Sequence, residues 1–177
     1  MGADRLKREL SFLGIGAGVG IVWISFWGLT PEHGLRAWGL MFIVAAALYD
    51  AVWGIVPNPL TLTGVATVLL ASFLMPTLSG LEALWGALVG GGLLFGVGVG
   101  ISWVLQKEAL GGGDVKLMAL IGAVVGWQSV FSVMFLSAAL ALIWIVFVFF
   151  LRGGPLQRAV HFGPWLGVAT ILAVVLK

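Results

Sequence analysis

Residues 117–151 read LMALIGAVVGWQSVFSVMFLSAALALIWIVFVFFL, a run that contains no charged side chain. Three further charge-free runs cover residues 10–31, 51–81 and 83–106. A helix needs about 20 apolar residues to cross a bilayer, and its backbone groups must be hydrogen-bonded within the segment. The four runs therefore predict an all-α protein, a polytopic integral membrane helical bundle of about six to seven transmembrane helices.

The composition agrees with a membrane protein and excludes several kinds of site. Hydrophobic residues make up 61% of the chain and charged residues 9%, which is more apolar surface than a soluble domain could cover. The chain contains no cysteine, which excludes disulfides, thiolate metal sites and cysteine nucleophiles. His33 and His161 lie in separate predicted loops, so we expect no metal site and no cofactor. A formal net charge of +2 does not indicate nucleic-acid binding.

The transmembrane helices can be located from the helix breakers between the apolar runs. We expect spans at Ser11–Leu29, Arg36–Val56, Leu60–Leu78, Leu81–Gln106, Asp114–Trp127, Ser129–Leu151 and Phe162–Leu176. The first is expected to be a retained span and not a signal peptide, because no cleavage site and polar mature domain follow it. The fifth reaches only about 21 Å, short of the hydrocarbon core. We treat residues 1–177 as a single membrane-embedded domain.

The basic residues predict the orientation. With a cytoplasmic N-terminus, alternating spans place these basic residues inside: Arg5, Lys7, Arg8, Lys107, Lys116, Arg152 and Arg158. Only Arg36 and Lys177 fall outside. Because cytoplasmic loops are enriched in Lys and Arg, we expect a multi-pass protein of the inner (cytoplasmic) membrane. This topology also brings Asp50 and Asp114 to the same cytoplasmic side.

Two acidic residues, Asp50 and Asp114, lie within or beside apolar stretches, the second in a glycine-rich turn. A charged side chain at the bilayer centre costs roughly 2.5 kcal/mol or more, so such residues mark pairing, transport or catalysis. Two neighbouring carboxylates share one proton, and the pair then offers a base to activate water and an acid to protonate a departing amine. A membrane-embedded carboxylate dyad is our leading hypothesis.

Three motifs resemble those of one family. LYD at residues 48–50, followed by IVPNPLTL at residues 55–62, resembles the first aspartate motif of type IV prepilin peptidases. GGGDVKLMALIGA at residues 111–123 is similar to their GxGD-x-KL-x-A-x-x-G segment. HFGPWL at residues 161–166 looks like their late FGP-x-L element. The motifs occur in the expected order and cover most of residues 36–170.

The resemblance implies an integral membrane aspartic endopeptidase that removes the leader peptide of prepilins or prepilin-like proteins at the cytoplasmic face. Asp50 and Asp114 match the family's catalytic pair. The implied partners are prepilin substrates and membrane lipid, and homo-oligomerisation is left open. Many bacterial members carry a four-cysteine zinc region and methylate the product. This cysteine-free chain looks like the shorter peptidase-only members, including those of Flp/Tad-type pili and archaeal preflagellin peptidases, so N-methyltransferase activity is not expected.

Six further residues are expected to bind substrate or shape the site: Gly111, Gly112, Gly113, Lys116, Asn58 and Pro57. The three glycines allow a close backbone approach around the second aspartate. The lysine is either a membrane-surface anchor or a group that orients an acidic part of the substrate. The asparagine either caps the third helix or bonds to substrate, and the proline stiffens the turn between spans. For His161 we favour an interfacial role over a catalytic one.

The two aspartates are also predicted to differ in protonation. Asp114 opens a predicted helix, whose N-terminal N–H groups favour a carboxylate, whereas Asp50 lies near a helix C-terminal end. We therefore expect Asp114 to be the base toward water and Asp50 the protonated acid.

Three alternative functions remain to be weighed against the peptidase. A small proton- or ion-coupled transporter also uses intramembrane carboxylates, although no internal repeat is evident. A presenilin-like intramembrane aspartic protease shares the Tyr-Asp and GxGD patterns, but the PN-x-LT and KL-x-A-x-x-G flanks favour pilin processing. A structural membrane subunit would explain the helices and leave both aspartate motifs unexplained.

Overall fold

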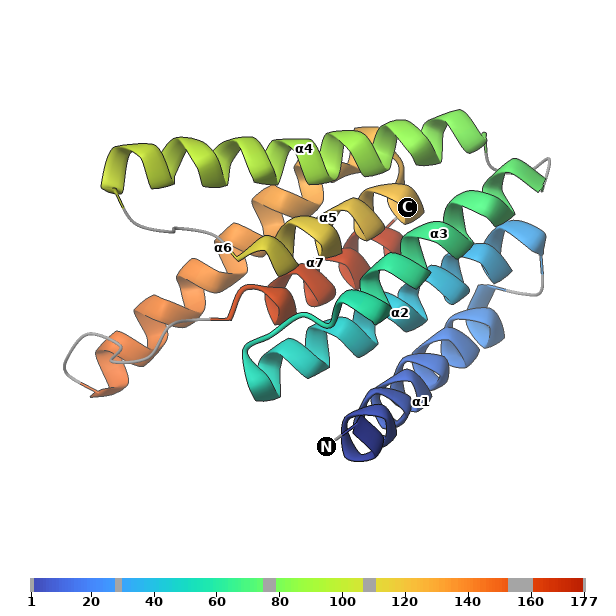
Figure 1. Ribbon diagram of the computed structural model, residues 1–177, viewed down its shortest axis with the longest axis horizontal. Coiled ribbons are helices and arrows are strands. Elements are labelled where there is room, and N and C mark those ends of the chain that lie inside the picture. The colour runs from blue at the N-terminus through green and yellow to red at the C-terminus, as the bar shows by residue number, and fades with distance from the viewer. Residues whose placement is uncertain (1, 28–29, 75–78, 107–110, 153–160, 177) are drawn as a thin grey trace.

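The structure is a computed structural model that describes residues 2–27, 30–74, 79–106, 111–152 and 161–176. The described part folds into seven helices and contains no strand (Figure 1), which confirms the all-α fold. The helices are α1 (Gly2–Trp27), α2 (Pro31–Trp53), α3 (Asn58–Leu74), α4 (Gly80–Leu105), α5 (Gly112–Val125), α6 (Trp127–Arg152) and α7 (Gly163–Val175).

Three of these helices are long and apolar enough to cross a membrane by themselves. They are the segments Glu32–Trp53 of α2, Gly80–Leu105 of α4 and Trp127–Leu151 of α6. Shorter apolar segments lie at Glu9–Val22 within α1, at Asn58–Leu74 and at Gly163–Val175, and the chain is a multi-pass helical membrane protein. The predicted span ends at Leu29 and Leu78, and the predicted loop cations Lys107, Arg158 and Lys177, lie outside the described residues.

The helix ends differ from the predicted ones for local reasons. The first helix begins at Gly2 and not at Ser11, because charged residues prevent membrane insertion without preventing a helix. The second begins at Pro31, where proline suits the first helical position and Thr30 Oγ1 accepts a hydrogen bond from the His33 N–H at 3.2 Å. It ends at Gly54, whose φ of 67° lies in the left-handed region that glycine adopts without strain.

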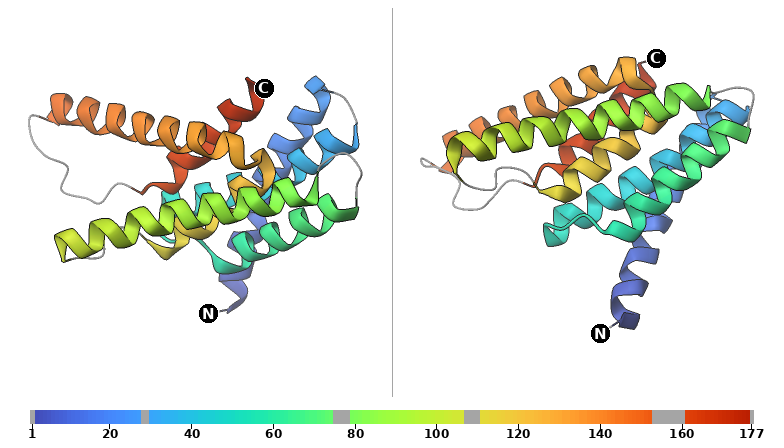
Figure 2. Two further views of the ribbon diagram at one scale, coloured as in Figure 1. Left: turned by 90° about the horizontal axis from the view of Figure 1, so that it is seen from above. Right: turned by 45° about the horizontal axis from the view of Figure 1, so that its top comes forward.

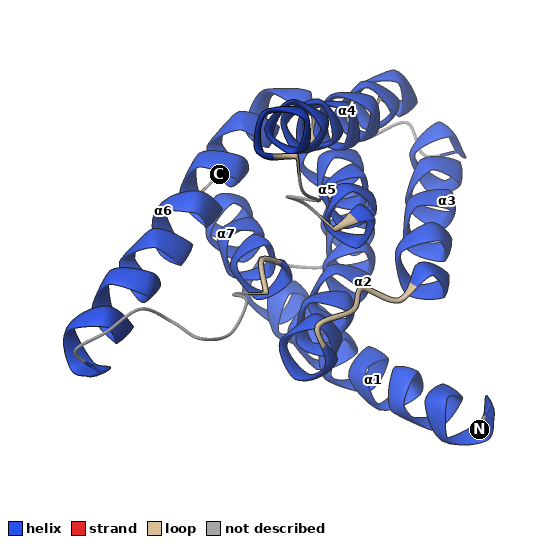
Figure 3. Cartoon of the chain, turned by 60° about the vertical axis from the view of Figure 1, so that its left-hand side comes forward, coloured by secondary structure: helices blue, strands red, loops and turns tan. Residues whose placement is uncertain are grey.

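Helix α5 occupies the centre of the bundle. It packs against α2, α3, α4, α6 and α7, and Figure 3 shows it enclosed by these helices. Five of its side chains are completely buried: Leu117, Met118, Leu120, Ile121 and Ala123. The predicted short fifth span is therefore a core helix of 14 residues, against which five other helices pack.

Glycines bring α4 and α5 into backbone contact. A Cβ added at Gly86 would collide with the carbonyl of Gly122, and one added at Gly90 would lie 2.5 Å from the carbonyl oxygen of Met118. Small residues allow this approach in membrane bundles, where packing drives helix association. The long α4 therefore holds the central helix along its length.

Helix α1 lies at the edge of the bundle. It packs against α2, and its N-terminal end projects beyond the other helices (Figure 2). Its Phe12 ring stacks edge-on against Tyr49 and Trp53, at centroid distances of 5.7 and 5.2 Å. These contacts cover the part of α2 that carries Asp50.

Candidate active site

Asp50 lies one turn before the end of α2. The Gly54 N–H donates to the Asp50 carbonyl oxygen at 2.7 Å and closes the helix. The chain then reverses into the turn that leads to α3. Only 5% of Asp50 is exposed, so its carboxyl group needs partners within the protein.

Asp114 lies in the first turn of α5. Gly111 precedes the helix in an extended conformation, and its carbonyl oxygen accepts the Asp114 N–H at 3.1 Å. Gly113 lies against the α2–α3 turn, since an added Cβ would be 2.8 Å from the Cβ of Val56. An added Cβ at Gly112 would meet open space. The predicted close backbone approach is therefore found at Gly113.

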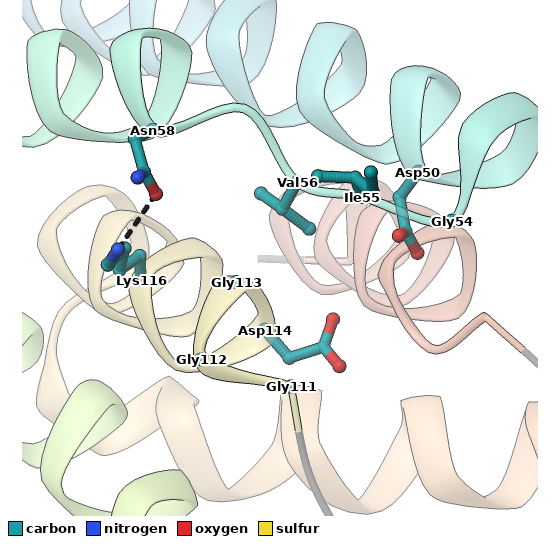
Figure 4. A pocket seen from close by; sticks show the side chains of 10 residues that line it. All are labelled: Asp50, Gly54, Ile55, Val56, Asn58, Gly111, Gly112, Gly113, Asp114 and Lys116. Atoms are coloured by element: carbon teal, nitrogen blue, oxygen red, sulfur yellow. Dashed lines mark hydrogen bonds between the residues drawn. The ribbon is translucent and has the colours of Figure 1, made fainter.

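A cavity of about 390 Å³ lies between these two elements. The carboxyl groups of Asp50 and Asp114 point toward each other across it (Figure 4), and they interact electrostatically. The cavity is lined by Asp50, Gly54, Ile55, Val56, Asn58, Gly111, Gly112, Gly113, Asp114 and Lys116. Pro57 is buried in the same turn but does not line the cavity. Two helices thus bring the predicted aspartates together from positions far apart in the sequence.

Lys116 and Asn58 connect α5 with the start of α3. Lys116 Nζ donates to Asn58 Oδ1 at 2.7 Å, across 58 residues of sequence (Figure 4). Lys116 lines the cavity, which agrees with the second of its two expected roles, a group at the site, and that role stays a prediction. Capping of α3 by Asn58 is not what the structure shows, because Asn58 is the first residue of the helix and its side-chain oxygen binds the lysine.

The start of α7 supplies two groups that the sequence-based interpretation missed. The Gly163 N–H donates to Asp50 Oδ2 at 3.1 Å. The imidazole of His161 interacts electrostatically with both carboxylates and lies so close to Gly54 that an added Cβ there would be 2.5 Å from Nε2. An interfacial position alone does not describe His161. The HFGP sequence at residues 161–164 was the signal that could have placed this segment at the site, but it served only to support the resemblance to the family.

The predicted difference in protonation loses its stated reason. Asp50 does lie near the C-terminal end of its own helix, but the N-terminus of α7 faces it and donates the Gly163 N–H to its carboxylate. Each carboxylate therefore lies at the N-terminal end of a helix: Asp114 at that of its own helix α5, and Asp50 at that of α7, which packs against it. Which carboxylate holds the proton at rest stays a prediction.

The arrangement suits acid–base chemistry on a bound molecule. Two carboxylates with a shared space between them can take a proton from water and give one to a leaving group. Lys116 and His161 add basic side chains at the same site. Among the described residues, no three His, Asp or Glu side chains group together as a metal site would require.

Comparison with known proteins assigns the family. The model of the type IV leader peptidase family matches residues 37–146, a stretch that contains both aspartates. The prepilin leader peptidase/N-methyltransferase of Pectobacterium carotovorum subsp. carotovorum is 29% identical over 154 residues, which cover 85% of this chain and 55% of that protein. Its Pseudomonas aeruginosa counterpart is 33% identical over 150 residues, covering 83% and 51%.

A shorter relative matches over most of its length. The leader peptidase HopD of Salmonella typhimurium is 35% identical over 129 residues, which cover 72% of this chain and 83% of HopD. The chain spans about half the length of the two longer relatives. No solved structure matches the chain. The matched stretch includes both carboxylates and every residue that lines the cavity, and the chain belongs to the type IV leader peptidase family.

Proposed function

We propose that this protein is a membrane aspartic endopeptidase that removes the leader peptide from prepilins or prepilin-like proteins at the cytoplasmic face of the membrane. The observation that carries the proposal is the pair Asp50 and Asp114, which face each other across one cavity. The family match and the names of the relatives support the choice of a peptide leader as substrate.

Asp50 and Asp114 act together on water in this proposal. The ionised carboxylate removes a proton from a water molecule held between them, and the water oxygen bonds to the scissile carbonyl carbon. The protonated carboxyl group donates to the carbonyl oxygen as the tetrahedral intermediate forms. Collapse of this diol intermediate re-forms the C=O bond and breaks the C–N bond: one hydroxyl returns its proton to the carboxylate that donated it, and the departing amine takes the proton that came from water. The dyad ends with one proton, ready for another cycle.

The other residues that line the cavity bind the substrate. The exposed backbone at Gly111 and Gly112 gives a peptide room beside Asp114. Lys116, held in place by Asn58, presents a positive charge to an acidic part of the substrate. Pro57 stiffens the turn that carries Asn58 and Val56. The transporter alternative has no comparable support, because the matched family consists of leader peptidases.

The proposal includes an orientation in the inner membrane with the N-terminus in the cytoplasm. Because the chain has no cysteine, single cysteines can be introduced and labelled without background. Gln106→Cys and Ser79→Cys are exposed and lie at opposite ends of α4. In intact cells, an impermeant thiol reagent should label the second variant and not the first. The reverse pattern contradicts the orientation.

Incubation of the detergent-solubilised protein with candidate prepilins tests the activity. Mass spectrometry of the products should show one cut between the basic leader and the apolar helix of the pilin. A chain that is folded and inserted but leaves every candidate intact, under conditions in which a known leader peptidase cuts them, contradicts the proposal.

A further inference from the structure

Gly163, the first residue of α7, makes a contact that the dyad chemistry described above does not use. Its N–H donates to Asp50 Oδ2 at 3.1 Å, and this buried bond joins residues 113 positions apart. The bond is the direct link between α7 and the cavity that lies between α2 and α5.

The local sequence is suited to this bond. A Cβ at position 163 would lie 2.6 Å from Asp50 Oδ2 and 3.0 Å from Asp50 Cβ, so only glycine allows the helix end to come this close. The first N–H groups of a helix have no partner within it, so the Gly163 N–H is available at no cost to α7. Pro164 follows and has no N–H of its own, which leaves Gly163 as the donor.

A donor at this point fixes a torsion that is otherwise loose. Rotation of an aspartate carboxylate about the Cβ–Cγ bond has broad, roughly two-fold preferences, so burial alone does not set the plane of the group. The Gly163 N–H holds Oδ2, and Oδ1 is then the oxygen left to share a proton with Asp114. The N-terminal end of α7 also directs its positive end at this carboxylate.

We propose that Gly163 is a positioning residue for the peptidase reaction: its backbone N–H sets the plane of the Asp50 carboxyl group so that Oδ1 faces the shared proton and the attacking water. This inference rests on the proposed peptidase function. It predicts that a disturbance at Gly163 slows the chemical step, while substrate binding by the residues that line the cavity is retained.

Gly163→Ala tests this role, and α7 itself supplies a matched control. Gly167 lies one turn further along the same helix and also faces α2, where an added Cβ would be 2.8 Å from the Cβ of Ala47. Both substitutions crowd the contact between α2 and α7, but only the first one touches Asp50. We expect Gly163→Ala to lower kcat about 10²-fold, the effect of a misplacement near 1 Å. KM should change by less than about twofold, and Gly167→Ala should leave both constants near wild type.

Replacement of Gly163 by glycolic acid gives a second, gentler test. The ester oxygen removes the N–H and adds no Cβ, and the Phe162 carbonyl, now part of the ester, still accepts the Trp165 and Leu166 N–H groups, although more weakly. We expect kcat to fall at least about tenfold with matched thermal melting. This variant decides the question if Gly163→Ala does not fold.

The outcomes separate the two proposals. Wild-type protein without leader cleavage contradicts the proposed function and, with it, the positioning role. If the wild type is active, two results contradict the positioning role and leave the proposed function standing. One is a Gly163→Ala variant that is no slower than Gly167→Ala, and the other is an ester variant that keeps the wild-type kcat. A rise in KM at constant kcat also contradicts it, because binding would then be the step affected.

Discussion

Gly113→Ala should reduce both stability and leader cleavage, although it adds one methyl group in a chain that is rich in glycine. The new Cβ would lie 2.8 Å from Val56 Cβ and 3.1 Å from Val56 Cγ2. Carbon atoms pack best at about 3.5–4.0 Å, so α5 and the α2–α3 turn must separate by about 1 Å. Overpacking of this kind costs about 1–3 kcal/mol.

The same shift reaches the proposed chemistry, because Gly113 precedes Asp114 and the turn against it follows Asp50. A misplacement of about 1 Å between reacting groups costs about 10²-fold in rate. Thermal melting in detergent and kcat on a prepilin substrate measure the two effects. Gly112→Ala is the control one residue away, where an added Cβ meets open space. Because alanine is the better helix former, it should be neutral or stabilising by up to about 1 kcal/mol. Because Gly112 also lines the cavity, it is the control for stability alone, and equal losses of stability in the two variants would refute the close approach of Gly113 to Val56.

Three further predictions concern the cavity and its chemistry. A dyad that shares one proton predicts a bell-shaped dependence of kcat/KM on pH, since activity falls when the pair gains a second proton and when it loses the shared one. EDTA should have no effect, and recovery of EDTA-inhibited activity by a divalent metal would contradict the dyad. Lys116→Met and Asn58→Ala should be coupled by about 0.5–3 kcal/mol in a double-mutant cycle on unfolding, whereas additive effects would show that their hydrogen bond contributes nothing. The purified chain should leave the product N-terminus unmethylated when S-adenosylmethionine is supplied, and a mass increase of one methyl group would contradict this.

The helices and the two acids could be predicted from the sequence because their signals are local. Charge-free runs locate the helices, and an acid inside such a run is conspicuous wherever the chain folds. The prediction for Asp114 also drew on its own neighbours, Gly111 to Lys116. The expected topology brought both acids to the same side of the membrane, which permits a dyad, and the structure places both carboxyl groups at one cavity.

The partners of these residues could not be predicted, because they are brought together by the tertiary fold. Lys116 bonds to Asn58 across 58 residues, and nothing in either motif specifies the other. The Gly163 N–H reaches Asp50 across 113 residues, and a backbone donor leaves no side-chain signal beyond the glycine itself. The prediction of the protonation order considered the helix that carries Asp50 and not α7, which faces it, because that contact is also a product of the tertiary fold.

Leader cleavage by Asp50→Asn and Asp114→Asn, measured beside the wild type at equal expression and matched melting, tests the central claim most directly. Asparagine keeps the shape of the side chain but cannot share or transfer the proton, so either substitution removes half of the dyad. We expect each variant to be folded and inserted in the membrane and to release no mature pilin. Turnover near the wild-type rate by either variant would contradict the carboxylate dyad as the catalytic group.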